Sequence, residues 1–238
     1  MASSIYTILL LRSIELTIVF IPSSLKPKKN TIYLQTWHGT PIKRIVLDDH
    51  NISWFYKKWI HKVVASHVTY LLAPCNEEIT DLLANAFSIA KNKMISLGYP
   101  RNDIFVEKKA NPDEIKERIK PNLSKTNKKI ILYAPTFRDD EVKHNFNINF
   151  DMMKKQLDDE IILLVRAHSS VEIQGILSDQ EFIFDVTKYP DMQELLYIAD
   201  ILITDYSSSF FDYTLLCRPI IFYPYDLEKY TNEIRGFY

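Results

Sequence analysis

The sequence is poor in glycine and cysteine, and several common ligand-binding motifs are missing from it. Its four glycines form neither a Gly-x-Gly-x-x-Gly nor a Walker loop, which argues against dinucleotide and ATP sites. Its two cysteines, Cys75 and Cys217, provide no disulfide framework and no zinc spacing, and they fit a reducing compartment. Cys217 follows two leucines and is expected to be buried. No Asp-x-Asp pair follows a predicted strand, so we expect no metal and no other cofactor.

Net charge is also nearly absent. A formal charge of −1 argues against a nucleic-acid-binding protein, because such proteins are usually strongly basic. The charge is uneven, however: residues 22–67 contain eight Lys or Arg and two acidic residues. This basic segment favours an anionic acceptor or an anionic membrane surface as a partner. The alternative is an ordinary solvated face.

The sequence has no long uncharged apolar run. Ile5–Ile21 is mostly apolar, but Arg12 and Glu15 interrupt it, so it is too short and too charged for a membrane span. It also lacks the basic start and the small-residue cleavage site of a signal peptide. We expect one or two core strands there, or a strand and a helix, with a membrane-surface anchor as the alternative.

Short apolar runs alternate with amphipathic helical patterns, which predicts an α/β fold with parallel sheets. The expected strands are Thr31–Leu34, Tyr70–Ala73, Lys93–Ser96, Lys129–Ala134, Ile161–Ala167, Phe182–Asp185, Ile201–Thr204 and Pro219–Tyr223. The expected helices are Ser53–Ala65, Glu77–Ala86, Pro112–Ile119, Asp151–Asp159, Met192–Ile198 and Ser209–Leu216. A polar stretch, Glu107–Lys128, places a boundary near Ala110 and predicts two α/β domains, 1–110 and 111–238, with a cleft between them.

The predicted helix Ser53–Ala65 is amphipathic and basic. Its aromatic and aliphatic residues fall on one arc at 100° per residue, and its lysines fall on the other. Such a helix either covers a sheet and exposes its lysines to water, or lies on a membrane surface. The sequence leaves both interpretations open.

The stretch Gln35–Arg44 follows a predicted strand and combines proton-transfer and phosphate-binding side chains. His38 can exchange a proton near neutral pH. Gly39 permits a tight turn, and Lys43 and Arg44 supply positive charge, with Arg able to hold phosphate through two hydrogen bonds. These residues predict a reaction centre for a phosphorylated substrate, with a structural turn as the alternative.

Four further loops carry polar side chains where ligands bind in open α/β sheets, beyond the carboxyl ends of strands. Three serines, Ser207 to Ser209, begin a predicted helix whose N-terminus favours an anion, although one serine would suffice as a cap. By strand alternation, Arg166 and His168 point to the same side and suit a diphosphate, with a structural histidine as the alternative. The remaining candidates are Pro135 and Thr136 after Lys129–Ala134, Arg101 after Leu97–Pro100, and Asp212 in the helix after the serines.

Together these motifs resemble the CDP-glycerol glycerophosphotransferases, the teichoic acid primases and polymerases of Gram-positive bacteria. The resemblance covers roughly Ile32 to Tyr238. The motifs that carry it, in family order, are Trp37-His38-Gly39-Thr40-Pro41, Gly98-Tyr99-Pro100-Arg101, Tyr133-Ala134-Pro135-Thr136-Phe137-Arg138, Arg166-x-His168, and Thr204-Asp205-Tyr206-Ser207-Ser208 with Asp212.

The resemblance implies a GT-B fold, in which two Rossmann-like domains face a cleft. It implies a transferase that moves glycerol phosphate from CDP-glycerol to a hydroxyl of a membrane-linked polymer and releases CMP. Domain 1–110 would be the acceptor side and 111–238 the CDP-glycerol-binding side. Family members extend further at both ends, so both domains are expected to be incomplete. The protein is expected to act peripherally at the cytoplasmic face of the cell membrane, on a lipid-linked acceptor and without nucleic acid.

The resemblance also assigns residues by position. His38 and His168 are the expected catalytic residues, with His38 as the base for the acceptor hydroxyl. Arg166, His168 and the serine helix start would hold the diphosphate, and Asp212 the ribose. The donor-site residues implied are Gly39, Thr40, Pro41, Ile42, Arg101, Pro135, Thr136, Arg166, Ala167, Ser207, Ser208 and Asp212.

Three alternatives remain open from sequence. The donor could be CDP-ribitol, because the distinguishing contacts are to the polyol. The chain could be a truncated remnant that binds nucleotide or membrane without turnover. A glycosyltransferase using a nucleotide sugar is weaker, because the Trp-His-Gly-Thr motif fits it less well.

Overall fold

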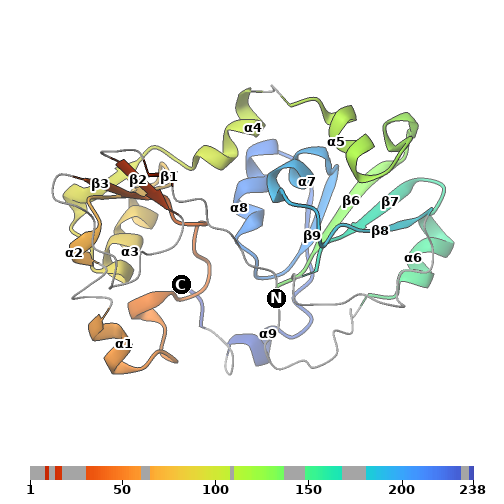
Figure 1. The fold of residues 1–238 in the computed structure, drawn as a ribbon. Coiled ribbons are helices and arrows are strands. Elements are labelled where there is room, and N and C mark those ends of the chain that lie inside the picture. Colours follow the sequence, from red (N-terminus) through yellow and green to blue (C-terminus); the bar gives the residue numbers. More distant parts are fainter. Residues whose placement is uncertain are drawn as a thin grey trace. The chain divides into compact units, whose positions relative to one another are not determined.

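A computed structural model of the chain describes residues 9–10, 14–17, 31–59, 65–107, 110–136, 148–167, 181–231 and 236–238. The chain forms two compact units (Figure 1). Unit 1 comprises Met1–Pro100 and Glu228–Tyr238, and unit 2 comprises Arg101–Leu227. Two α/β domains were predicted with a boundary near Ala110; the observed division falls ten residues earlier, because Phe105 packs into the core of unit 2.

Unit 1 contains a five-stranded sheet in the order β1-β2-β3-β4-β5, antiparallel between β1 and β2 and parallel elsewhere. The predicted strands in the apolar N-terminal stretch are therefore present. The strands are β1 (Leu9–Leu10), β2 (Ile14–Thr17), β3 (Ile32–Gln35), β4 (Tyr70–Ala73) and β5 (Met94–Ser96). The helical elements are η1 (Val46–Asp48), α1 (Trp54–Trp59), α2 (Ala65–His67), α3 (Glu77–Phe87) and η3 (Lys91–Lys93).

The best-defined helix of unit 1 is α3. Asn76 caps it by accepting the Ile79 N–H at 2.9 Å, and two glutamates in its first turn complement the helix dipole. Its apolar side packs Leu83 and Phe87 against Tyr33 and Leu71 of the sheet, and all four side chains are buried. This core supports the end of β3, from which the histidine motif emerges.

Unit 2 contains a five-stranded, all-parallel sheet in the order β10-β9-β6-β7-β8. The chain builds outward from β6 to one side and then restarts on the other side with β9, so the topological switch point lies between β6 and β9. Ligands of doubly wound sheets bind beyond the carboxyl ends of the strands at that point. The strands are β6 (Lys129–Ala134), β7 (Ile161–Val165), β8 (Ile183–Asp185), β9 (Ile201–Thr204) and β10 (Ile220–Phe222).

Helices cover both faces of this sheet (Figure 1). Along β6, Ile130 and Leu132 face a core formed with α5 and α7, whereas Ile131 and Tyr133 face the core that contains Phe150 of α6. Burial of both faces explains the continuous apolar runs in the sequence. The helical elements of unit 2 are α4 (Asp103–Glu107), α5 (Pro112–Ile119), η5 (Leu123–Lys125), α6 (Phe150–Leu157), α7 (Met192–Ile198), α8 (Ser209–Tyr213) and η6 (Thr214–Leu216). Two short elements, η4 (Pro100–Asn102) and α9 (Leu227–Lys229), each contain the residues at which the chain passes from one unit to the other.

The predicted α/β fold with parallel sheets is confirmed, and most differences are at element ends. β7 ends at Val165 instead of Ala167, and the helix from Ser209 becomes a tighter 3-10 turn after Tyr213. α4 was not predicted, because its five residues are too few to show a helical period. Cys217 is exposed, contrary to expectation: it follows the 3-10 turn as its C-terminal cap, with a φ of 51°, and not as a residue of a buried helix face. Residues 60–64 of the predicted helix Ser53–Ala65 lie outside the described residues.

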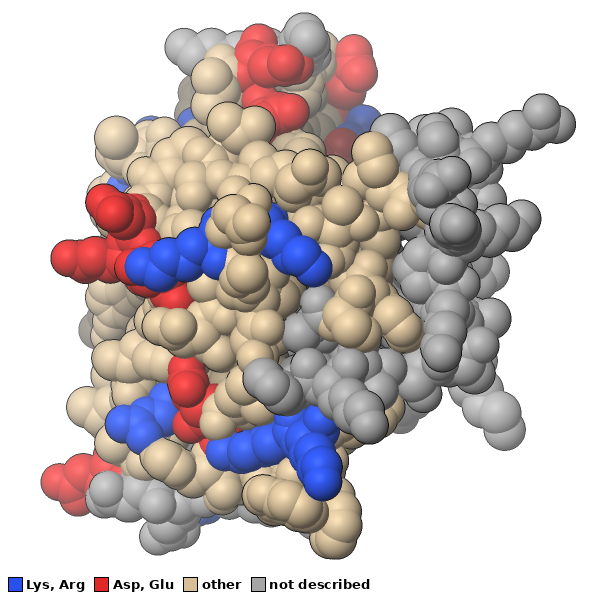
Figure 2. Space-filling view, turned by 90° about the vertical axis from the view of Figure 1, so that its left-hand side faces the viewer, with Lys and Arg blue, Asp and Glu red and all other residues tan. Residues whose placement is uncertain are grey.

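Lys and Arg are interspersed with Asp and Glu on the face of unit 1 that Figure 2 presents. Several of the basic residues counted in the segment 22–67 lie outside the described ranges. Among the helices that the structure describes, none is both long and apolar enough to cross a membrane.

Candidate functional site

The predicted site residues fall in both units. In unit 1, the chain leaves β3 through a turn fixed by Gln35, whose side chain is completely buried. Its carbonyl oxygen accepts the Trp37 N–H at 2.8 Å, and its amide donates to the Tyr33 hydroxyl at 3.2 Å. Trp37 itself has a φ of 56°, which is strained for a bulky residue and is a common feature of functional loops. The positive φ of this loop therefore lies at Trp37, two residues before the glycine that was expected to permit a tight turn.

Trp37 connects the core of unit 1 to His38. Its ring packs edge-on against Phe87, with centroids 4.7 Å apart, and lies 3.7 Å from the His38 ring. His38 is exposed, whereas Gly39, Thr40 and Pro41 after it are buried. His38 is therefore accessible from outside the loop, as a general base must be to come within hydrogen-bond reach of a substrate hydroxyl.

Two of the sequence motifs meet in unit 1. The Tyr99 hydroxyl donates to the Gly39 carbonyl at 3.4 Å, and Tyr99 is 6% exposed. Gly98, at a φ of 84°, donates its N–H to the Ala73 carbonyl at 3.0 Å. The Gly-Tyr-Pro motif therefore supports the histidine loop, a role that the sequence did not reveal.

In unit 2, the ends of β6 and β9 are joined at the switch point by Asp205. One carboxylate oxygen of this buried residue accepts the Thr136 N–H at 2.8 Å and the Tyr206 N–H at 2.5 Å. The Thr204 hydroxyl adds a 2.7 Å hydrogen bond to the Ala134 carbonyl. Asp205 belongs to one of the sequence motifs, but no role was predicted for it. An acidic residue directly after a buried strand is the signal that could have indicated one. It places Pro135 and Thr136 beside the strand end that leads to Ser207.

Arg166 follows β7, the other neighbour of β6. Its N–H donates to the Tyr133 carbonyl at 2.9 Å, and its Nη1 donates to the Tyr189 carbonyl at 3.0 Å. Burial lowers the pKa of Arg166, although nearby Asp191 opposes the shift; an arginine keeps its positive charge at physiological pH regardless. Buried Ala167 donates its N–H to the Thr187 hydroxyl at 3.1 Å.

Some predicted residues lie outside the described ranges. His168 is among them, as are Phe137 and Arg138 of the third motif. The expected alignment of Arg166 with His168 stays a prediction. In the part of the chain that the structure describes, His, Cys, Asp and Glu form no group of three or more that could hold a metal ion.

The serine run leads into α8. The Ser207 hydroxyl lies 2.9 Å from the Ser209 hydroxyl and accepts the Ser209 N–H at 3.3 Å. Ser207 thus acts as a local cap, while the side chain of Ser208 makes no capping bond. Both serines are partly exposed, so their hydroxyls remain available to a ligand. Anion binding at this helix start stays a prediction.

Asp212 and Arg101, both predicted site residues, form a bidentate ion pair within unit 2. Arg101 donates from Nε at 2.9 Å and from Nη2 at 3.0 Å. Asn102 adds a bond of 2.8 Å and Gln193 one of 3.0 Å, so both carboxylate oxygens accept two hydrogen bonds each. The Asp212 side chain is 7% exposed. Sequence reasoning missed Asn102 and Gln193, since nothing in their spacing connects them to Asp212.

Tyr213, next to Asp212, gives unit 2 a pH-dependent contact. Its hydroxyl donates to the Ala199 carbonyl at 3.0 Å, and burial raises the pKa of Tyr213 to about 12. An unfolded tyrosine ionises near pH 10, so the unfolded state loses this proton first as the pH rises. We expect stability to fall between pH 10 and 12, by roughly 2–3 kcal/mol at most.

Urea denaturation of the parent and of Tyr213→Phe at pH 8.5 and 11.5 tests this expectation. The phenylalanine variant has no proton to lose, so the parent's stability advantage should shrink at the higher pH. An advantage that is the same at both pH values would contradict the prediction.

Comparison with known proteins agrees with this geometry. The family model described as CDP-glycerol:poly(glycerophosphate) glycerophosphotransferase matches residues 1–238. A teichoic acid glycerol-phosphate transferase of Staphylococcus aureus is 42% identical over 230 residues, covering 91% of this chain and 58% of that protein. A teichoic acid poly(ribitol-phosphate) polymerase of Bacillus spizizenii is 36% identical over 172 residues, covering 68% of this chain and 27% of that protein.

Among solved structures, the wall teichoic acid polymerase TagF, as a histidine-to-asparagine variant soaked with CDPG, matches with a TM-score of 0.82. The identity is 37%, and the match covers 95% of this chain and 57% of that one. The chain thus spans less than two thirds of each of these relatives. The predicted GT-B fold class is confirmed by this match. With its full length matched by the family model, the chain belongs to the CDP-glycerol:poly(glycerophosphate) glycerophosphotransferase family.

Proposed function

We propose that this chain carries the active region of a transferase that moves glycerol phosphate from CDP-glycerol to a hydroxyl of a polyol-phosphate polymer. The observation that carries the proposal is the set of residues at the carboxyl ends of three adjacent strands. Thr136 follows β6, Arg166 follows β7 and Ser207 follows β9, on either side of the switch point. A guanidinium group, hydroxyls and backbone N–H groups at the carboxyl ends of these strands suit a nucleoside diphosphate.

The proposed step is a substitution at the phosphorus that bears glycerol. The acceptor oxygen forms a bond to this phosphorus, and the bond to the bridging oxygen breaks, so that CMP leaves. His38 takes the proton of the acceptor hydroxyl, and Arg166 and His168 balance the charge that develops on the departing phosphate. Thr136 and the serine hydroxyls orient the diphosphate, and the hydrogen-bonded carboxylate of Asp212 holds the helix that begins at those serines.

Glycerol is favoured over ribitol as the polyol of the donor. The relative named for glycerol phosphate is more similar to this chain, and over more of its length, than the relative named for ribitol phosphate. The test is CMP release from CDP-glycerol by the purified chain with a lipid-linked acceptor analogue, run beside CDP-ribitol. Acceptor-dependent release from CDP-glycerol supports the proposal. If the folded chain binds CDP-glycerol but releases no CMP, the proposal is wrong and the chain is a remnant that binds nucleotide without turnover.

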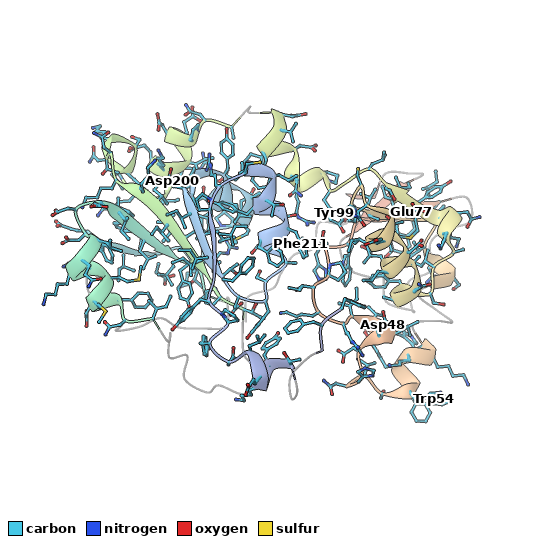
Figure 3. The ribbon with its side chains drawn as sticks, turned by 180° about the vertical axis from the view of Figure 1, so that it is seen from behind. Asp48, Trp54, Glu77, Tyr99, Asp200 and Phe211 are labelled. Carbon is cyan, nitrogen blue, oxygen red and sulfur yellow. The ribbon has the colours of Figure 1, made fainter. Side chains whose placement is uncertain are left out.

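A lipid-linked acceptor requires the protein to work at a membrane surface, at the cytoplasmic face of the cell membrane. The support for this part of the proposal is α1. Its described residues include none that is buried, which disfavours the alternative of a helix covering the sheet. Trp54 is 63% exposed and Phe55 78% exposed, and Trp54 projects from the end of α1 (Figure 3). Lys58 lies 5.0 Å from the Trp54 ring, an arrangement of aromatic and cationic groups that suits an anionic bilayer surface.

We expect the double substitution Trp54→Ser and Phe55→Ser to reduce flotation with phosphatidylglycerol vesicles by about tenfold or more, because each ring loses apolar burial of the order of 1.5 kcal/mol. Val106→Ser, at an exposed apolar residue of unit 2, is the matched control and should float like the parent. A parent chain that fails to float at low salt would rule out membrane contact through α1.

A further inference from the structure

Unit 1 has a hollow beside the segment that follows the histidine motif. Its volume is about 580 Å³, within the range of small-molecule sites. Leu47 and Phe237 supply apolar surface, and the polar lining consists of Arg44, Asp48, His50, Lys57 and Tyr238. The segment Gly236–Tyr238 forms one wall, because Lys43 and Phe237 pair as a β-bridge and Tyr238 donates its N–H to the Ile42 carbonyl at 3.2 Å.

Arg44 is held in place by uncharged partners. Its backbone N–H donates to the Gly236 carbonyl at 2.9 Å, and its Nε donates to the Phe237 carbonyl at 3.3 Å. Its Nη1 donates to Nε2 of His50. A Cβ at position 236 would lie 3.3 Å from Cδ of Arg44, so glycine leaves room for this arrangement. The guanidinium is therefore ordered before a ligand arrives, and these contacts leave its charge uncompensated.

The acidic residue of the hollow, Asp48, accepts a hydrogen bond from a tyrosine. The Tyr238 hydroxyl donates to the Asp48 carboxylate at 2.7 Å and accepts the Ile45 N–H at 3.2 Å. Burial, with help from this carboxylate, raises the pKa of Tyr238, so the phenol remains a donor at neutral pH. Asp48 lies on η1, just before α1 (Figure 3), and its bond to Tyr238 leaves it less able to repel an anion.

The two lysines of α1 differ in direction. Lys57 donates from Nζ to the Leu47 carbonyl at 2.7 Å and lines the hollow, whereas Lys58 lies over the Trp54 ring. One hydrogen bond uses only one of the three donors of an ammonium group. Lys57 can therefore bind an anion in the hollow while it keeps its bond to the protein.

The charges of the lining favour a monoanion. Arg44 and Lys57 are positive and Asp48 is negative, so these three side chains together carry one positive charge. A phosphodiester carries one negative charge, and its two free oxygens match the donor fork of an arginine. Arg44, His50 and Lys57 come from different turns of the chain and line the same hollow. This arrangement favours a binding site over an ordinary solvated surface.

We propose that this hollow binds a phosphodiester group of the acceptor polymer through Arg44, His50 and Lys57. The inference rests on the proposed function, which makes a polyol-phosphate polymer the acceptor. Arg44 lies six residues after His38 on the same segment. The hollow and the proposed base therefore belong to the same structural unit, so this unit would hold the acceptor polymer and also carry the base. The subsite would let the enzyme select an acceptor that already carries phosphodiesters.

The test measures binding of a soluble oligo(glycerol phosphate) and of inorganic phosphate by calorimetry at low salt. Lys57→Gln should weaken oligomer binding by about tenfold, the usual effect of losing a charge-assisted hydrogen bond. His50→Gln is a second variant at an exposed residue and should weaken it less. Lys91→Gln removes an equal charge from an exposed lysine of the same unit and should leave oligomer binding unchanged.

In turnover, Lys57→Gln should raise the KM for the acceptor and leave the KM for CDP-glycerol unchanged. A parent that releases no CMP would defeat the proposed function, while the calorimetry still decides the subsite. Equal oligomer binding by the three variants would overturn the inference, as would an oligomer that binds no tighter than inorganic phosphate. If Lys57→Gln weakens vesicle flotation but not oligomer binding, the phosphate bound is that of a lipid headgroup, and the acceptor subsite is wrong.

Discussion

Replacing His38 with alanine is expected to reduce acceptor-dependent CMP release by about 100- to 10,000-fold, the usual contribution of general-base catalysis. The affinity for CDP-glycerol should remain as in the parent, because His38 acts on the acceptor hydroxyl and the proposed donor contacts come from unit 2. The fold should also survive, because His38 is exposed and the loop is fixed through Gln35, Trp37 and Gly39. The measurement is CMP release at saturating CDP-glycerol, with donor affinity determined separately by calorimetry.

His67→Gln is the matched control for this experiment. His67 lies in unit 1 at the end of α2, outside every motif of the resemblance, and its replacement should leave the rate near that of the parent. If His38→Ala releases CMP as fast as the control, His38 is not the base. If His38→Ala instead loses CDP-glycerol binding, the histidine is a donor contact.

The sequence predicted the frame of unit 2 well. The bounds of β6, β9, α5 and α7 match the predicted ranges. Their signals are local: buried apolar runs, an Asn-Pro start before α5, and an Asp cap before α7 whose side chain accepts the Gln193 N–H at 2.8 Å. Because parallel strands end at one sheet edge, the bounds of β6 and β9 placed Thr136 and Ser207 at that edge, and the predicted strand Ile161–Ala167, two residues longer than β7, placed Arg166 near it.

What the sequence could not show depends on contacts between distant residues. The clamp around Asp212 joins residues up to 111 positions apart, and Gly236–Tyr238 returns to pack against residues 42–48. No periodicity encodes such pairings. The backbone of the histidine loop also depends on such contacts: the side chain of Gln35 and the aromatic packing of Trp37 stabilise a positive φ one residue before His38, which no local pattern indicates.

Asp212→Asn is expected to destabilise the protein by about 3 kcal/mol, the lower end of the cost of breaking a buried ion pair. The lower end applies because the Arg101 side chain keeps 24% of its surface in water. Each carboxylate oxygen of Asp212 accepts two hydrogen bonds, one oxygen from Arg101 and Gln193 and the other from Arg101 and Asn102. In either orientation, the NH₂ group of an asparagine would therefore face two donors. For a chain of this size the melting temperature should fall by about 6–12 °C.

Asp81→Asn provides the comparison, since Asp81 pairs with Lys91 at 2.5 Å on the surface, where the two side chains are 37% and 68% exposed. Exposed pairs contribute about 0–1 kcal/mol, so this variant should melt close to the parent. The Asp212 clamp ties Arg101 and Asn102 to α8, the helix that begins at the proposed phosphate-binding serines. A loss of stability accompanied by weaker CDP-glycerol binding would identify a structural clamp that sets the position of those serines. An Asp212→Asn variant that melts with the parent yet loses CDP-glycerol would instead give the carboxylate the ribose-binding role that the family resemblance implies.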